Sequence, residues 1–166
     1  MSNFFVKYLF VVLTSAWVLC LDQATKIFIH TQFPRQKSKA IIEGFFNITY
    51  VTNSGGAFGL GNSVPEWLRV ILFLFLPLVC VYLIFKLLQE TDNRFQILAL
   101  SFILGGAFGN LLDRLRLGYV VDFIDWHVKD WHWPTFNIAD SFIVLGVAIL
   151  SFFYIKEHQQ NKEQNT

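Results

Sequence analysis

Two aspartates, Asp122 and Asp140, lie where apolar stretches of the chain meet polar ones. Asp122 follows an apolar stretch that ends near Leu112, and Asp140 opens the next one. An Asp at the centre of a membrane helix costs roughly 3 kcal/mol, so an acid within or beside such a helix calls for a functional explanation. Two carboxylates about 4 Å apart repel by about 4 kcal/mol at an effective dielectric of 20, so near neutral pH such a pair shares one proton. We therefore expect the two aspartates to meet near a membrane surface and to act as a catalytic acid and base.

Other polar side chains accompany these acids at helical spacing. Asn110, Asp113 and Arg114 share one helical face, and Asn137 lies three residues before Asp140 in the first turn of a helix. We expect Asn110 and Asn137 to hold the acids or the peptide backbone, and Arg114 to pair with Asp113 or to bind substrate carbonyls. The alternatives are a cluster of snorkelling side chains at the membrane edge and, for Asp140, helix N-terminal charge complementarity worth up to about 1 kcal/mol.

Two further motifs have both a structural and a functional explanation. Asp22 and Lys26 are spaced i, i+4, which predicts an ion pair at the end of a helix worth about 0.3–0.5 kcal/mol, or a charge pair that braces the site entrance. Asn53, beside Gly55 and Gly56, predicts an ordinary hairpin turn or a clamp over the substrate.

Other kinds of site find little support. Residues 115–135 hold His127 and His132 among three aspartates, but they lack HExxH or another regular ligand spacing, so no metal site is expected. The glycines of residues 55–61 do not form a phosphate-binding pattern, and no cofactor is expected. A net charge of +1 provides no basic surface for nucleic acid.

The frame that must position these residues is strongly apolar. Hydrophobic residues make up 54% of the chain and charged ones 15%, whereas a soluble domain carries about 25% charged residues. Eighteen helical residues reach about 27 Å, close to the roughly 30 Å thickness of a bilayer core. We expect an all-α membrane protein, a single integral membrane domain over residues 1–166, with four transmembrane helices at residues 4–21, 67–88, 95–112 and 136–155.

The polar segments should lie outside the bilayer. Residues 31–65 are rich in strand-forming types and predict a small extracytoplasmic β-sheet on the membrane surface. Residues 115–135 predict a polar connection whose tryptophans form an interfacial aromatic belt. Gly105 and Gly109 form a GxxxG pattern, which predicts close approach of another helix.

Charge counting does not decide which side of the membrane each segment faces. With both termini inside, five basic residues lie inside and eight outside: Lys7, Lys86, Arg94, Lys156 and Lys162 against Lys26, Arg35, Lys37, Lys39, Arg69, Arg114, Arg116 and Lys129. The positive-inside rule does not favour that orientation. Setting aside Lys26, Arg69 and Arg114 as site or helix-edge residues leaves five on each side.

Five motifs occur in order along this frame: DQATK at 22–26, NSGGAF at 53–58, GGAFGNLLDR at 105–114, VVDF at 120–123 and FNIAD at 136–140. Each motif is weak alone, but the ordered set closely resembles bacterial lipoprotein signal peptidase, also called signal peptidase II, over essentially the whole chain. One departure is Gly56, where the family often has Ala.

The resemblance implies a membrane aspartic endopeptidase without a metal or cofactor. Its substrates would be prolipoproteins whose lipobox Cys carries diacylglycerol, cut just before that Cys, with Asp122 and Asp140 as the catalytic acids. It also implies the bacterial cytoplasmic (inner) membrane, an active site at the outer leaflet and cytoplasmic termini. Diacylated precursors and membrane lipid are the expected partners, and we expect a monomer, although the GxxxG pattern leaves the oligomeric state open.

A non-enzymatic function is the competing hypothesis. Paired carboxylates in membrane helices are typical of proton relays, so a small carrier or proton pathway would use the same acids. Against it, both acids lie at one membrane edge, and the chain lacks the inverted repeats of many transporters. A purely structural assembly protein would not explain acids at the mouths of helices.

Overall fold

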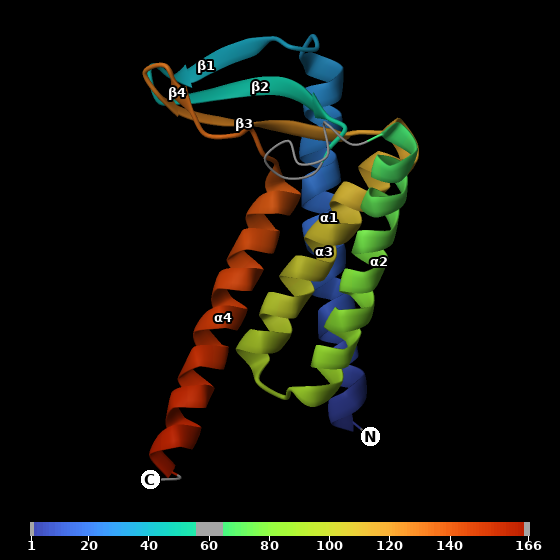
Figure 1. Ribbon diagram of the computed structural model, residues 1–166, viewed down its shortest axis with the longest axis vertical. Coiled ribbons are helices and arrows are strands. Elements are labelled where there is room, and N and C mark those ends of the chain that lie inside the picture. Colours follow the sequence, from blue (N-terminus) through green and yellow to red (C-terminus); the bar gives the residue numbers. More distant parts are fainter. Residues whose placement is uncertain (1, 56–64, 165–166) are drawn as a thin grey trace.

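The computed structural model describes residues 2–55 and 65–164. These residues form four helices and one small sheet: α1 (Ser2–Gln32), β1 (Ser38–Ile42), β2 (Phe46–Asn53), α2 (Glu66–Glu90), α3 (Arg94–Leu117), β3 (Val120–Val128), β4 (Trp131–His132) and α4 (Ile138–Gln164). The helices run alongside one another, the sheet lies across one end of them, and both termini lie at the other end (Figure 1).

The helices coincide with the predicted apolar segments and mostly extend beyond them, although α4 begins at Ile138, two residues later than predicted. Among the residues that the structure describes, three stretches are long and apolar enough to cross a membrane: Phe4–Gln32, Arg94–Leu117 and Ile138–Lys156. α2 is 25 residues long and contains the predicted span 67–88. That α2 crosses the membrane stays a prediction. The largest difference is in α1, which runs to Gln32 although the predicted span ends at Leu21.

α3 lies at the centre of the helix packing and contacts α1, α2 and α4. Its glycines explain how closely these neighbours approach. A Cβ at Gly105 would lie 2.7 Å from the Ser15 carbonyl oxygen of α1, and one at Gly106 would lie 2.5 Å from the Ala139 carbonyl oxygen of α4. Real Cβ atoms do not tolerate such distances, so the GxxxG prediction of close helix packing is confirmed.

The sheet is antiparallel, in the order β1-β2-β3-β4. β1 and β2 come from the predicted strand-rich segment 31–65, whereas β3 and β4 come from residues 115–135, for which a polar connection was predicted. The strands of this segment were missed because Asp122 and Asp125, which are both buried, interrupt the apolar residues of β3. Its pairing with β2 is also a contact between residues far apart in the sequence, such as Val51 with Asp122.

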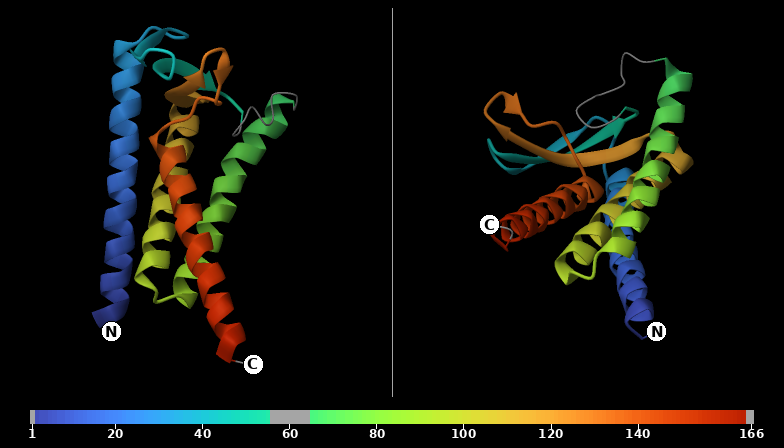
Figure 2. Two further views of the ribbon diagram at one scale, coloured as in Figure 1. Left: turned by 90° about the vertical axis from the view of Figure 1, so that its left-hand side faces the viewer. Right: turned by 60° about the horizontal axis from the view of Figure 1, so that its bottom comes forward.

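Alternation along β3 gives the sheet two different faces. Val121 and Phe123 are buried in a cluster with Ile29 of α1 and Tyr50 of β2, which anchors the sheet to the C-terminal end of α1. Asp122, between them in sequence, points to the opposite face, toward the helix ends. Seen from the side, the sheet lies over the ends of the helices (Figure 2).

Candidate active site

Asp122 is almost fully buried, with 2% of its surface exposed. Two side-chain amides donate to its two carboxylate oxygens: Asn53 Nδ2 to Oδ2 at 2.9 Å and Asn137 Nδ2 to Oδ1 at 2.7 Å. Asn53 ends β2 and pairs with Val120, so the strand register brings it beside Asp122. Its Oδ1 accepts a hydrogen bond from the Gly55 N–H at 3.0 Å, which turns the amide nitrogen toward the carboxylate.

Asp140 lies in the first turn of α4 and is partly exposed. Asn110 Nδ2 donates to its Oδ1 at 2.8 Å, and the Asn137 backbone N–H donates to its Oδ2 at 3.2 Å. In return, the Asp140 N–H donates to Asn137 Oδ1 at 2.9 Å. This reciprocal pair is a capping box, so Asp140 also stabilises the start of its own helix.

A short backbone contact brings the two acids together. Ile124 of β3 forms an antiparallel bridge with Phe136, one residue before Asn137. The start of α4 is therefore held against the middle of the sheet. Asn137 then contacts both acids, through its side chain to Asp122 and through its backbone to Asp140. The two aspartates that were predicted to meet, Asp122 and Asp140, thus both accept hydrogen bonds from Asn137.

The electrostatics of Asp122 follow from this burial. Desolvation raises the pKa of Asp122 most, and the negative charge of Asp140 raises it further, to about 7. The hydrogen bonds from Asn53 and Asn137 oppose the rise because they favour the charged form. A carboxyl group whose pKa is raised to about 7 can hold or release a proton near neutral pH, which suits proton transfer.

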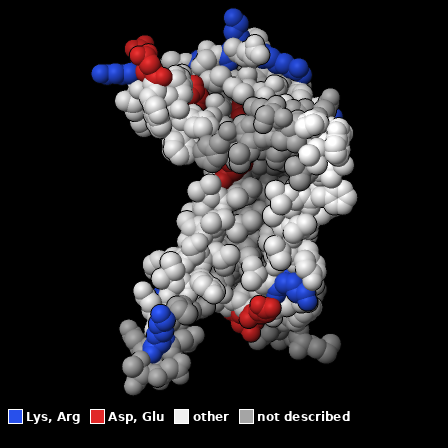
Figure 3. All heavy atoms as spheres, viewed as in Figure 1, with Lys and Arg blue, Asp and Glu red and all other residues white. Residues whose placement is uncertain are grey.

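Both acids line one cavity of about 630 Å³ between the sheet and the helices. The molecule is hollowed at this level, with acidic atoms visible in the recess (Figure 3). Apolar side chains from three helices form its lower wall and aromatic side chains its upper wall: Leu76, Pro77 and Cys80 of α2, Ala107 of α3, Ile143 and Val144 of α4, then Trp126, Trp133 and Phe136. The cavity therefore combines an acidic pair with a long apolar surface.

Arg114 also lines this cavity. Its Nη2 donates to the Gly55 carbonyl oxygen at 3.1 Å and its Nη1 to the Asn110 carbonyl oxygen at 3.2 Å. Arg114 thus ties the turn after β2 to α3. Gly56, the other glycine of the proposed clamp, lies outside the described residues, as does the rest of the NSGGAF motif up to Phe58.

Asp22 and Lys26 differ from the predicted pair at a helix end. Because α1 continues to Gln32, the pair lies inside the protein, with Asp22 0% and Lys26 2% exposed. Lys26 Nζ contacts Asp22 Oδ2 at 2.9 Å and Asp113 Oδ2 at 3.1 Å. Asp113 thus binds Lys26 of α1, a partner that was not predicted for it.

Sequence reasoning missed Gln23 in this group. Its Nε2 donates to Asp113 Oδ1 at 3.0 Å, to the Gly109 carbonyl oxygen at 3.2 Å and to Asp22 Oδ2 at 3.2 Å. One signal could have identified Gln23: it lies inside the DQATK motif, in a helix that continues past the apolar segment. In the described part of the chain, no group of three or more His, Cys, Asp or Glu side chains is placed to hold a metal ion.

The family model described as Signal peptidase (SPase) II matches residues 14–156. The chain belongs to the signal peptidase II family. Its motif resemblance is therefore confirmed, and the protein is a peptidase of a bacterial membrane family.

Similar proteins cover nearly the whole chain. The lipoprotein signal peptidase of Desulforapulum autotrophicum is 41% identical over 145 residues, 86% of this chain and 90% of that protein. The lipoprotein signal peptidase of Geobacter metallireducens is 37% identical over 157 residues, 92% and 94% of the two chains. A solved bacterial membrane enzyme superposes with a TM-score of 0.79 at 31% identity, covering 90% of each chain.

Proposed function

We propose that this signal peptidase II is an aspartic endopeptidase that removes the signal peptide from diacylglyceryl-modified prolipoproteins. It cuts the peptide bond just before the lipidated Cys. The family and the lipoprotein signal peptidases that resemble the chain support this substrate class. The observation that carries the catalytic assignment is the meeting of Asp122 and Asp140, from two distant elements, in one cavity around Asn137.

The environments of the two acids favour different roles. Asp122 is the more deeply buried, and its pKa of about 7 keeps it protonated often enough to donate to the scissile carbonyl oxygen. Asp140 is more exposed and acts as the base that takes a proton from water. The water oxygen bonds to the carbonyl carbon, whose oxygen takes the proton of Asp122. When the C–N bond then breaks, the proton held by Asp140 passes to the departing amine of the Cys, and the re-forming carboxyl group returns a proton to Asp122.

The cavity walls suit a lipidated peptide. Its volume of about 630 Å³ lies within the usual range for ligand sites. The extended peptide would lie under the sheet beside the two acids, where Asn53 and Arg114 offer polar contacts. The acyl chains would lie lower, against apolar residues such as Leu76 of α2, Ala107 of α3 and Val144 of α4.

The proposal includes a placement in the cell, which this arrangement supports. All four helices cross the bacterial cytoplasmic (inner) membrane, the sheet rests on its outer surface, and both termini lie in the cytoplasm. Exposed Trp126, Trp131 and Trp133 would then lie at the level of the headgroups, where tryptophan is enriched. The two aspartates would meet diacylated precursors at the outer leaflet, and membrane lipid would surround the helices.

The test compares three matched variants of purified protein on a diacylated precursor, with cleavage followed as a gel shift. Asp122→Asn and Asp140→Asn each remove a catalytic carboxylate without changing its size, so we expect cleavage to fall by about 10²–10⁴-fold. Asp125→Asn is the control, because that carboxylate lies on the opposite face of the same strand and binds His132, Asn47 and Thr49. Its rate should stay within a few-fold of the original.

A near-normal rate in either of the first two variants would contradict the proposal. The carrier hypothesis makes a different prediction for the same protein in proteoliposomes. Proton flux without release of a peptide would support a proton pathway, whereas peptide release without proton flux supports the peptidase.

A further inference from the structure

A buried lysine connects the elements that carry the two site aspartates. Lys26 of α1 is 2% exposed, and its ammonium group contacts two carboxylates that are themselves buried, Asp22 at 2.9 Å and Asp113 at 3.1 Å. Buried ion pairs contribute little net stability, because desolvation offsets their attraction. Stability alone therefore does not account for this group, and its hydrogen bonds indicate what else it does.

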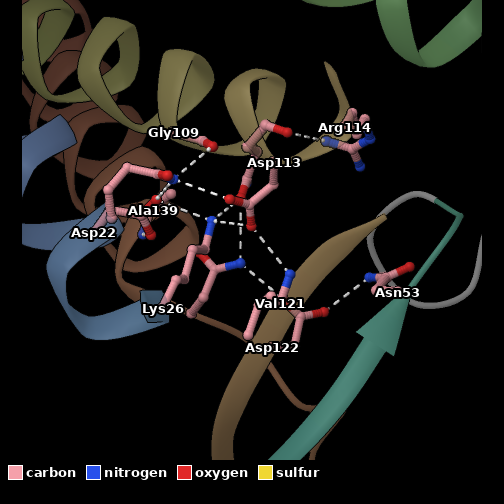
Figure 4. Close-up of polar contacts among 12 residues, drawn as sticks. Asp22, Lys26, Asn53, Gly109, Asp113, Arg114, Val121, Asp122 and Ala139 are labelled. Atoms are coloured by element: carbon pink, nitrogen blue, oxygen red, sulfur yellow. Dashed lines mark hydrogen bonds and ion pairs between the residues drawn. The ribbon is translucent and has the colours of Figure 1, made fainter. Parts of the chain in front are cut away.

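Each of the two carboxylates holds a backbone N–H next to a site aspartate (Figure 4). Asp113 Oδ2 accepts a hydrogen bond from the Val121 N–H at 3.1 Å, one residue before Asp122. Asp22 Oδ1 accepts one from the Ala139 N–H at 2.9 Å, one residue before Asp140. The two anchors thus fix the backbone on both sides of the cavity, and the same ammonium group holds both anchors.

Lys26 also orients an amide of the site. Its Nζ donates to Asn110 Oδ1 at 2.9 Å, so the Asn110 nitrogen must point the other way, toward Asp140 at 2.8 Å. Asn137 Nδ2 donates to the same oxygen at 3.2 Å. An amide whose oxygen receives an ammonium donor cannot turn over without placing two donors against each other.

The helices pack tightly around the buried group of Asp22, Lys26 and Asp113. A Cβ at Gly109 would come within 2.5 Å of Asp22 Oδ2, so only glycine allows the Asp22 carboxylate to lie between α3 and α4. Gln23 closes the group from the side by donating to both carboxylates. Side chains from α1 and α3 therefore form one buried unit that reaches β3 and α4.

We propose that Lys26 is a positioning residue for peptide hydrolysis, acting through Asp22, Asp113 and Asn110 to set the placement of Asp122 and Asp140. This inference rests on the proposed function, because it assumes that the two aspartates are the catalytic pair. Lys26 does not itself touch substrate. Its loss should therefore impair the chemical step more than substrate binding.

The test begins with Lys26→Met, which removes the ammonium group and keeps a side chain of similar length. A misplacement of about 1 Å can cost about 100-fold in rate, so we expect kcat to fall by about 10- to 100-fold while KM stays within about twofold. Amide hydrogen exchange at Val121 and Ala139, measured by NMR without substrate, should become at least about tenfold faster at both positions. Lys39→Met is the matched control, an exposed lysine of β1, and should change neither readout.

Asp113→Asn and Asp22→Asn extend the test in case Lys26→Met folds poorly. Each keeps the shape of the side chain and weakens one anchor. Asp113→Asn should accelerate exchange at Val121 but not at Ala139, and Asp22→Asn should do the reverse, with kcat reduced in both. A general loss of stability would instead accelerate exchange throughout α3 and lower the activity in proportion to the folded fraction.

Unchanged exchange at the paired amide, a wild-type kcat in either Asn variant, or the general pattern of instability would each overturn the proposal. The exchange measurement also separates this inference from the proposed function. If the paired pattern of exchange is found but Asp122→Asn still cleaves normally, then the anchors exist and the assignment of the catalytic pair is the part that fails.

Discussion

At the scale of single residues, the protein places two identical side chains, Asp122 and Asp140, in different environments. Asp122 is buried under the sheet and accepts hydrogen bonds from two asparagine amides, Asn53 and Asn137. Asp140 is more open, at the start of a helix whose N-terminal N–H groups favour a negative charge. Environments that differ in this way separate the roles of acid and base in a pair of carboxyl groups.

This difference predicts a pH profile. Because burial and the charge of Asp140 raise the pKa of Asp122 to about 7, raising the pH through 7 removes the proton that Asp122 must donate. We expect kcat/KM to fall about tenfold per pH unit on the alkaline side, measured in detergent with the diacylated precursor. The Asp125→Asn variant should show the same limb, because hydrogen bonds from His132, Asn47 and Thr49 outweigh burial and hold the pKa of Asp125 below its ordinary value. A profile that stays flat to about pH 9 would contradict the role of Asp122 as the acid.

At the scale of elements, the glycines of α3 and α4 determine how closely the two helices pack. Gly106 of α3 faces the Ala139 carbonyl oxygen, and Gly146 of α4 faces the Ala99 carbonyl oxygen. Both contacts are equally tight, but only the first lies beside Asp140. The same helix pair thus offers one close contact at the site and another far from it.

Alanine at these two glycines should therefore separate packing from catalysis. In Gly106→Ala the new Cβ would meet Ala139 O at 2.5 Å, and in Gly146→Ala it would meet Ala99 O at 2.6 Å. Overpacking of this kind costs about 1–3 kcal/mol, so both variants should unfold at lower temperature. Only Gly106→Ala should also lower kcat of the folded protein, because it displaces the turn that carries Asp140. Equal kcat in the two variants would show that this turn tolerates displacement.

At the scale of the whole molecule, the site exists because the sheet closes over one end of the helices. Both termini lie at the opposite end, beyond the full length of the helices (Figure 1). If the helices cross the membrane, the sheet and the termini must lie on different sides of it. The acids, which lie beneath the sheet, then face the same side as the sheet.

Cysteine labelling checks this orientation. In a background with Cys20→Ala and Cys80→Ala, Lys39→Cys places a thiol on exposed β1, and Gln160→Cys places one near the end of α4. A maleimide that cannot cross membranes should label Lys39→Cys in intact spheroplasts, and should label Gln160→Cys only after permeabilisation. The reverse pattern would place the sheet in the cytoplasm and would exclude the outer leaflet as the site of cleavage.

The amino-acid sequence by itself determined the membrane frame and the identity of the chemical groups. Helical spans follow from apolar length alone, because a bilayer requires each lipid-facing segment to satisfy its own backbone hydrogen bonds. Asp122 and Asp140 stood out because acids are costly at the edge of such segments. The glycines of α3 likewise predicted a close helix contact, which Gly105 and Gly106 make.

Only the tertiary structure decided which groups meet. The strand β3 was overlooked because it is stabilised by pairing with β2, a contact between distant residues that no local pattern contains. The burial of Lys26 was missed for a related reason: the end of an apolar segment is not the end of its helix, and α1 carries this lysine onward into a site that α3, α4 and the sheet complete. Spacing along one helix predicts the neighbours on that helix, whereas a site built from several elements depends on how their surfaces pack.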